Sequence, residues 1–149
     1  MKVVILENIR SAYNVWNVIR TADALGRNVR IVGYTPSPLD NPKVRKTSLG
    51  AEESTGIQQF NFTTDAIQQA KELWLQVIAA EITDDAQQLW IFKPTSENIA
   101  VIFGNEVEGV LPQTLSAVDA VVAIPMNGVK ESLNIGQSAS IFMRELWKS

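Results

Sequence analysis

Residues 124–141 have the sequence IPMNGVKESLNIGQSASI, and this stretch decides the fold. It begins at the end of a short apolar run, residues 121–124, which predicts a buried strand. After the polar loop, four apolar residues recur at helical spacing: Ile135, Ala139, Phe142 and Leu146. They predict a final helix, and Ser132 and Asn134 stand at its N-terminus, where free backbone N–H groups favour an anion. Ordinary capping explains either residue individually, but it does not explain the whole polar loop after an apolar strand.

A second polar loop also follows an apolar strand. Residues 99–103 are apolar and run directly into GNEVEG at residues 104–109. Two glycines there flank two carboxylates, and glycine lets a backbone approach a ligand closely. The loop is neither a Walker A loop nor a dinucleotide-binding fingerprint, because the residues that define those motifs are absent. The residues alone leave two interpretations open: an acidic loop that caps the next helix, and a functional site.

A third polar cluster lies on the first predicted helix. Apolar residues at helical spacing predict this helix, with Gly26 as its stop: Val15, Val18, Ile19, Ala22 and Leu25. Asn14 lies near its N-terminus and could cap it. Arg20 lies among apolar neighbours, so we expect it to be partly buried. Taken alone, Arg20 is best explained as a surface residue in an ion pair.

The remaining pattern alternates strands with helices. Further strands are predicted at residues 3–6, 29–33, 57–60 and 75–80, and further helices at residues 43–49, 64–74, 86–90 and from Pro112. Short continuous apolar strands between helices indicate one α/β domain, residues 1–149, with a mainly parallel sheet covered by helices on both faces. In such sheets ligands bind beyond the carboxyl ends of the strands. The loops that follow residues 103 and 124 are therefore the first places to expect a site.

Composition narrows the chemistry. The 149 residues include no cysteine and no histidine, so thiolate catalysis, cysteine-ligated metals and a histidine base are excluded. We expect no metal, no membrane span and a cytoplasmic location. A net charge of −3 counts mildly against nucleic-acid binding. The densest basic cluster is Lys43, Arg45 and Lys46, which either contacts RNA phosphates or forms a solvated face.

We also predict where three of the tryptophans lie. Trp74 and Trp90 are expected in the core rather than as base-stacking platforms. Trp147, at the end of the last helix, is expected at a subunit contact.

Three segments, taken in order, resemble a known family. They are NVWNVIRTADALG at residues 14–26, VIFGNEVEGVLP at residues 101–112, and the stretch at residues 124–141. The segment KVRKTSLGAEE, residues 43–53, is similar to the family's loop after its second strand. The chain thus resembles the SpoU/TrmH family of the SPOUT methyltransferase superfamily over nearly its whole length.

The resemblance implies an α/β fold with a C-terminal trefoil knot, a homodimer with its active site at the subunit interface, and S-adenosylmethionine as cofactor. The reaction would be methylation of a ribose 2′-hydroxyl in tRNA or rRNA. Arg20 would be the catalytic arginine, and Asn14, Glu106, Ser132 and Asn134 would complete the catalytic set. The implied cofactor-binding residues are Phe103, Gly104, Gly109, Ile124, Met126 and Leu133. Lys43, Arg45 and Lys46 would bind RNA.

One position departs from the family pattern. The family usually has a small residue, often glycine, two positions after the first-motif asparagine, and this chain has Trp16. A bulky ring there would narrow the RNA cleft or offer a stacking surface. Arg20 could act as a base if its neutral form were favoured, or as a cation that stabilises developing oxyanion charge. The alternatives to an active methyltransferase are a non-catalytic RNA-binding or scaffold member of the same fold and an unrelated nucleotide-binding α/β protein.

Overall fold

The structure is a computed structural model, and it describes residues 1–42 and 50–148. Seven strands form one sheet in the order β3-β2-β1-β6-β4-β7-β5, and every pair of neighbours is parallel. The strands are β1 (Lys2–Glu7), β2 (Asn28–Val32), β3 (Gln58–Phe60), β4 (Gln76–Ala80), β5 (Gln87–Gln88), β6 (Ile99–Phe103) and β7 (Ala120–Ala123). The helices are α1 (Ala12–Ala24), α3 (Ala51–Ser54), α4 (Thr63–Glu72), α5 (Pro112–Leu115) and α6 (Ile135–Glu145).

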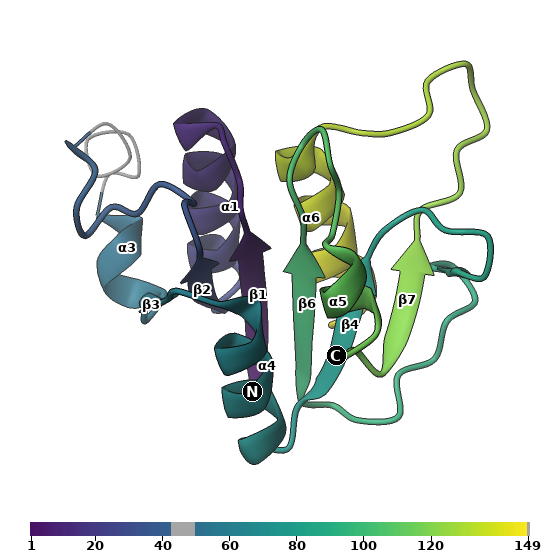
Figure 1. The fold of residues 1–149 in the computed structure, drawn as a ribbon, viewed down its shortest axis with the longest axis horizontal. Helices are drawn as coiled ribbons and strands as arrows, with labels where there is room; N and C mark the ends of the chain where they lie inside the picture. The colour runs from purple at the N-terminus through teal and green to yellow at the C-terminus, as the bar shows by residue number, and fades with distance from the viewer. Residues whose placement is uncertain (43–49, 149) are drawn as a thin grey trace.

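Helices cover both faces of this sheet, as predicted (Figure 1). Side chains alternate along each strand, so Val4 and Leu6 of β1 enter the core under α1 and α6. Val3 and Ile5 of the same strand enter a second core, which α4 closes. Both faces of the central strands are therefore apolar, and this explains why those strands are continuous apolar runs in the sequence.

Most predicted elements are confirmed to within two residues at each end. Gly26 follows α1 with a φ of +65°, the left-handed conformation in which glycine ends a helix. The helix predicted at residues 86–90 is wrong. Gln87 and Gln88 pair with Val122 and Ala123 of β7 instead and form the edge strand β5. Local helix propensity is weak, and pairing with the open edge of β7 overrides it.

The helix predicted at residues 43–49 lies outside the described residues. In the described part of the chain, no helix has the length and apolar character that crossing a membrane requires.

The tryptophans differ from expectation. Trp74 is 85% exposed, and it occupies a left-handed position with a φ of 60° just after α4. Trp90 is 50% exposed, next to the short edge strand. Neither ring is in the core, because each follows the last residues of an element rather than lying on its apolar face.

Trp147 is buried in the core of the chain and not at its surface. Its exposed fraction is 4%, and the guanidinium carbon of Arg27 lies 5.3 Å from its ring centroid. Burial lowers the pKa of Arg27. The expected subunit contact through Trp147 is therefore wrong.

Candidate functional site

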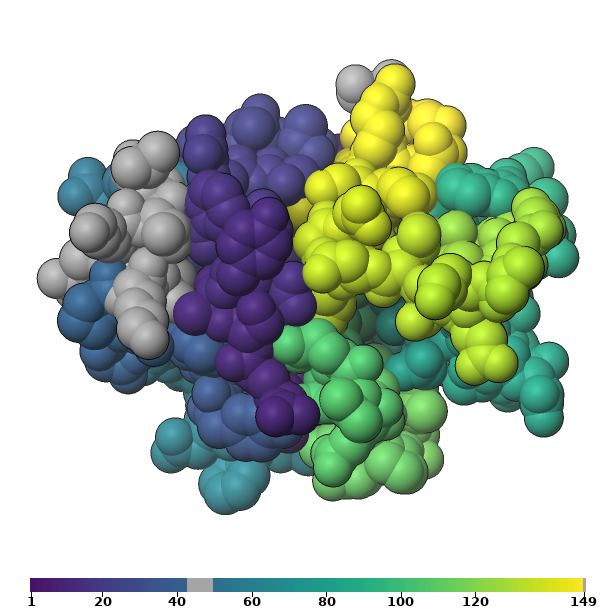
Figure 2. Space-filling view, turned by 90° about the horizontal axis from the view of Figure 1, so that it is seen from above, coloured from purple at the N-terminus to yellow at the C-terminus, as the bar shows by residue number. Residues whose placement is uncertain are grey.

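The site lies near the point where the strand order reverses, between β1 and β6. After β1 the chain turns to β2 and β3 on one side of the sheet, whereas after β6 it turns the opposite way, past β4 to β7. Ligands of open parallel sheets bind at such a point, beyond the carboxyl ends of the strands. Figure 2 looks onto this end of the molecule, where the start of α1, the loop after β6 and the segment that leads into α6 lie side by side.

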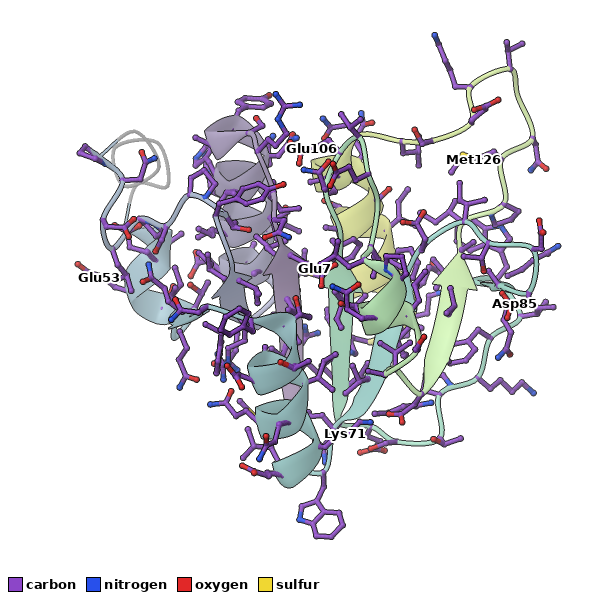
Figure 3. All side chains as sticks on the ribbon, in the orientation of Figure 1. Glu7, Glu53, Lys71, Asp85, Glu106 and Met126 are labelled. Atoms are coloured by element: carbon purple, nitrogen blue, oxygen red, sulfur yellow. The ribbon has the colours of Figure 1, made fainter. Side chains whose placement is uncertain are left out.

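Glu106 joins the loop after β6 to the loop after β1. Its Oε1 accepts a hydrogen bond from the backbone N–H of Arg10 at 2.9 Å, and its Oε2 accepts one from Ser11 N–H at 3.0 Å. The side-chain amide of Asn14 also donates to Oε2, at 3.4 Å. These donors belong to the start of α1, where backbone N–H groups have no partner within the helix and attract a carboxylate. Figure 3 shows Glu106 between the upper ends of α1 and α6.

Asn134, in the segment between β7 and α6, is hydrogen-bonded to the same group of residues. Its Nδ2 donates to Asn14 Oδ1 at 3.0 Å, and its Oδ1 accepts from the backbone N–H of Gly136 at 2.8 Å, which caps α6. Asn14, Glu106 and Asn134 thus form one hydrogen-bonded chain although they are far apart in sequence. The expectation that Asn14 caps α1 is wrong, because Ser11 is the N-cap and its hydroxyl accepts from Asn14 N–H at 3.2 Å.

A cavity of about 610 Å³ opens beside this chain of hydrogen bonds. Its volume falls within the roughly 300–1,000 Å³ that small-molecule and cofactor sites occupy. All six predicted cofactor-binding residues line it: Phe103, Gly104, Gly109, Ile124, Met126 and Leu133. Ser132 and the three residues of the hydrogen-bonded chain line it as well. Apolar walls next to a helix N-terminus suit a ligand with a flat apolar part and a charged part.

The backbone at Gly104 makes the wall of the cavity possible. A Cβ at this position would lie 2.3 Å from Val110 N, which is closer than any side chain tolerates. The loop closes on itself, since Asn105 N–H donates to Gly109 O at 3.2 Å and Gly109 N–H donates to Asn105 O at 2.9 Å. The GNEVEG segment is therefore a pinched loop whose form requires glycine, and a simple acidic cap of the next helix does not account for it.

Two residues of the site were missed by the sequence prediction. Glu81 follows β4 and lines the cavity, where its Oε2 accepts from Val110 N–H at 2.8 Å. Asn105 is 6% exposed, and its Oδ1 accepts from the N–H groups of Val107 and Glu108 at 2.8 and 2.9 Å. The rule that polar residues after strands mark the site could have found Glu81, because it directly follows the predicted strand at residues 75–80.

Arg20 is exposed, and it does not line the cavity. The expectation that it is partly buried is wrong, because its side chain points away from the apolar stripe of α1, which Val15, Val18, Ile19 and Ala22 form. Its guanidinium carbon lies 5.6 Å from the ring centroid of Trp16. An ion pair for Arg20 is also not found, since Lys148 and Glu145 form the single salt bridge among residues 1–42 and 50–148.

Lys43, Arg45 and Lys46, the predicted RNA-binding residues, lie outside the described residues. Across the part of the chain that the structure describes, no three or more His, Cys, Asp and Glu residues come together in a group that could hold a metal ion.

Comparison with known proteins supports the resemblance. The family model described as the SpoU rRNA Methylase family matches residues 1–144. The chain is 30% identical over 146 residues to a tRNA (guanosine(18)-2′-O)-methyltransferase of Thermus thermophilus, covering 95% of this chain and 72% of that protein. It is 28% identical over 145 residues to the 23S rRNA (guanosine(2553)-2′-O)-methyltransferase RlmP of Bacillus subtilis, covering 97% of this chain and 57% of that protein.

Solved structures agree with the fold. An AdoMet-bound rRNA methyltransferase from Sinorhizobium meliloti superposes with a TM-score of 0.86 at 28% identity, covering 97% of this chain and 54% of that one. A TrmH-family structure from Porphyromonas gingivalis, a putative RNA methyltransferase by its description, gives 0.86 at 24% identity, covering 99% of this chain and 59% of that one. The parallel sheet and these matches confirm the predicted fold class, the SPOUT α/β knot.

Proposed function

The chain belongs to the SpoU rRNA Methylase family of S-adenosylmethionine-dependent RNA 2′-O-methyltransferases, and from that premise we propose which residues bind, position and react. The observation that carries the proposal is the hydrogen-bonded chain of Asn14, Glu106 and Asn134 at the rim of the cavity. It brings three sequence motifs to one place, next to a space of the size a cofactor needs.

The cavity residues fit S-adenosylmethionine. Phe103, Ile124 and Leu133 present apolar surface to an adenine, and the pinched backbone at Gly104 removes side chains from one wall. Met126 and Gly109 complete the lining. The bound cofactor supplies a methyl group on a sulfonium, which is electrophilic without help from a metal.

The polar rim would bind the RNA. Ser132 lies at the mouth of the cavity beside the N-terminus of α6, where free N–H groups and a hydroxyl suit a substrate phosphate. Asn14 and Asn134 would orient the ribose, and Glu106 would keep Asn14 in place. Arg20 would act on the 2′-oxygen as the methyl group is transferred and the hydroxyl proton is lost to solvent. Lys43, Arg45 and Lys46 would add contacts to RNA phosphates.

We propose that the substrate is tRNA or rRNA, the two classes on which the curated relatives act. A non-catalytic scaffold would not need an intact cavity together with the three linked motifs. The test is incubation of the purified chain with labelled S-adenosylmethionine and RNA from a strain that lacks the gene, followed by mapping of the labelled ribose. Transfer to one 2′-oxygen is expected, and cofactor binding without transfer to any RNA would favour the scaffold.

Arg20→Ala tests the catalytic assignment. We expect transfer to be abolished while calorimetry still detects cofactor binding, because Arg20 lies outside the cavity. Gln137→Ala, an exposed position on α6, is the matched control. Full activity of Arg20→Ala would overturn the role.

We further propose that the active unit is a homodimer and that Arg20 serves the cavity of the partner subunit. Arg20 is exposed on α1 and is absent from the cavity of its own chain, so a second copy would complete the site. Light scattering should give the mass of two chains. Mixing Arg20→Ala with Gly104→Ala, each expected to be weakly active or inactive alone, should then restore transfer in hybrid dimers. No recovery after confirmed subunit exchange would place Arg20 in its own chain's site. The expected cytoplasmic location stays a prediction.

A further inference from the structure

Tyr13, Trp16 and Arg20 form a column on the outer face of α1. Positions three and four apart are neighbours on a helix, so each residue meets the next one along the column. The rings of Tyr13 and Trp16 have centroids 5.3 Å apart with planes tilted by 51°. The guanidinium carbon of Arg20 lies 5.6 Å from the centroid of the Trp16 ring. This separation lies within the ~6 Å at which a cation is attracted to an aromatic face.

Trp16 is the one partner recorded for the Arg20 guanidinium within residues 1–42 and 50–148. None of its N–H donors makes a hydrogen bond to those residues. The donors are therefore directed by the ring alone and stay available for an anionic group. A long side chain on an exposed helix face would otherwise sample many rotamers, and immobilising it costs free energy.

Trp16 is not kept in place by a hydrogen bond of its own. Its Nε1 is shielded from solvent and has no acceptor among residues 1–42 and 50–148. The ring itself makes the two contacts: the Arg20 guanidinium lies over its face, and the Tyr13 ring packs against it at a tilt. An aromatic side chain without the indole N–H should therefore reproduce what Trp16 does.

We propose that Trp16 is a positioning residue that fixes the orientation of the Arg20 side chain, with Tyr13 packed against the same ring. The inference rests on the proposed function of Arg20 and deepens it. An aromatic face attracts a guanidinium, and the contact limits the rotamers that the long Arg20 side chain can sample. Arg20 therefore reaches the ribose oxygen from a fixed direction, and less free energy is spent on ordering it when RNA binds.

The experiment compares Trp16→Phe with Trp16→Leu, and uses Trp74→Leu as a matched control because Trp74 is exposed and lies between α4 and the start of β4, away from α1. We expect Trp16→Leu to lower kcat about 3- to 10-fold, with cofactor affinity by calorimetry unchanged. Trp16→Phe should retain most of kcat, because a phenyl ring keeps the aromatic face. Trp74→Leu should behave like the wild type. Equal activity of the Leu and Phe variants would overturn the proposal, since size alone would then account for Trp16.

A second measurement does not depend on activity. In nitrogen-15 NMR spectra, ring current from Trp16 should shift the Arg20 Nε–Hε resonance, which Arg20→Ala identifies by its loss. Trp16→Leu should return this resonance to an ordinary position, and Trp16→Phe should keep part of the shift. An unshifted wild-type resonance would show that the contact does not form and would overturn the proposal. A shifted resonance in a chain without methyl transfer would instead mean that the proposed function has failed and the positioning has not.

Discussion

Two carboxylates stand at the ends of neighbouring strands, and each binds the loop that follows the other strand. Glu7 ends β1, and its Oε1 accepts from the backbone N–H of Leu111, beyond β6, at 2.9 Å. Glu106 lies beyond β6 and accepts from Arg10 and Ser11, beyond β1. Figure 3 places Glu7 inside the molecule and Glu106 at its upper end.

Glu7 and Glu106 differ in how deeply their side chains are buried. Glu7 is 0% exposed, and its Oε2 also accepts from the hydroxyls of Thr63 and Thr114, so it connects β1 to the starts of α4 and α5. Glu106 is exposed at the rim of the cavity. Both residues use a carboxylate to bind the loop after a neighbouring strand. We expect the buried Glu7 to contribute mainly to the stability of the fold. We expect the exposed Glu106, whose contacts water can replace, to contribute mainly to the position of the residues around the cavity.

Glu7→Ala should have the largest effect, and it falls on stability. The substitution leaves a cavity, and two buried hydroxyls and one partly buried N–H lose their acceptor, so we expect the free energy of unfolding to fall by about 3–5 kcal/mol. Urea denaturation measures this value. Glu108→Ala, an exposed carboxylate in the loop after β6, is the control and should change stability by less than about 0.5 kcal/mol. A loss below about 1 kcal/mol for Glu7→Ala would remove the distinction between the two carboxylates.

Glu106→Ala should act mainly on activity. Without its carboxylate, the start of α1 and Asn14 lose their fixed position at the cavity, and we expect kcat for methyl transfer to fall about 100-fold. Stability should change by less than about 1 kcal/mol, because water can hydrogen-bond to the released N–H groups. Glu106→Gln keeps one acceptor oxygen and should lie between the wild type and Glu106→Ala. If Glu106→Ala unfolds as readily as Glu7→Ala, the comparison fails.

Gly104→Ala should reduce stability by about 1–3 kcal/mol, less than Glu7→Ala does, through overpacking against the backbone of Val110. Its effect on cofactor affinity should be larger than its effect on the fold, because the displaced backbone is a wall of the cavity. Calorimetric titration with S-adenosylmethionine measures this affinity. Gly128→Ala is the matched control, since no atom lies within 4 Å of an added Cβ there. Similar affinities for both variants would show that the close backbone contact at Gly104 does not shape the cavity.

The sequence predicted much of this fold and site because their signals are local. Apolar runs and helical spacing predicted β1, β6 and α6, and the three motifs predicted six cavity residues that the structure does bring together. The edge strand β5 could not be predicted in this way. Gln87 and Gln88 carry no strand signal, and only the open edge of β7 gives them that conformation.

What the sequence determined by itself is most of the elements, the loops that follow β6 and β7, and membership of the family. Only the tertiary structure decided that Glu106 binds the start of α1, that Glu81 lines the cavity, and that Arg20 lies on the outer face against Trp16. The reason is physical. Periodicity records how each segment meets its own neighbours, whereas strand order and the contacts between loops come from packing between residues that are distant in the chain.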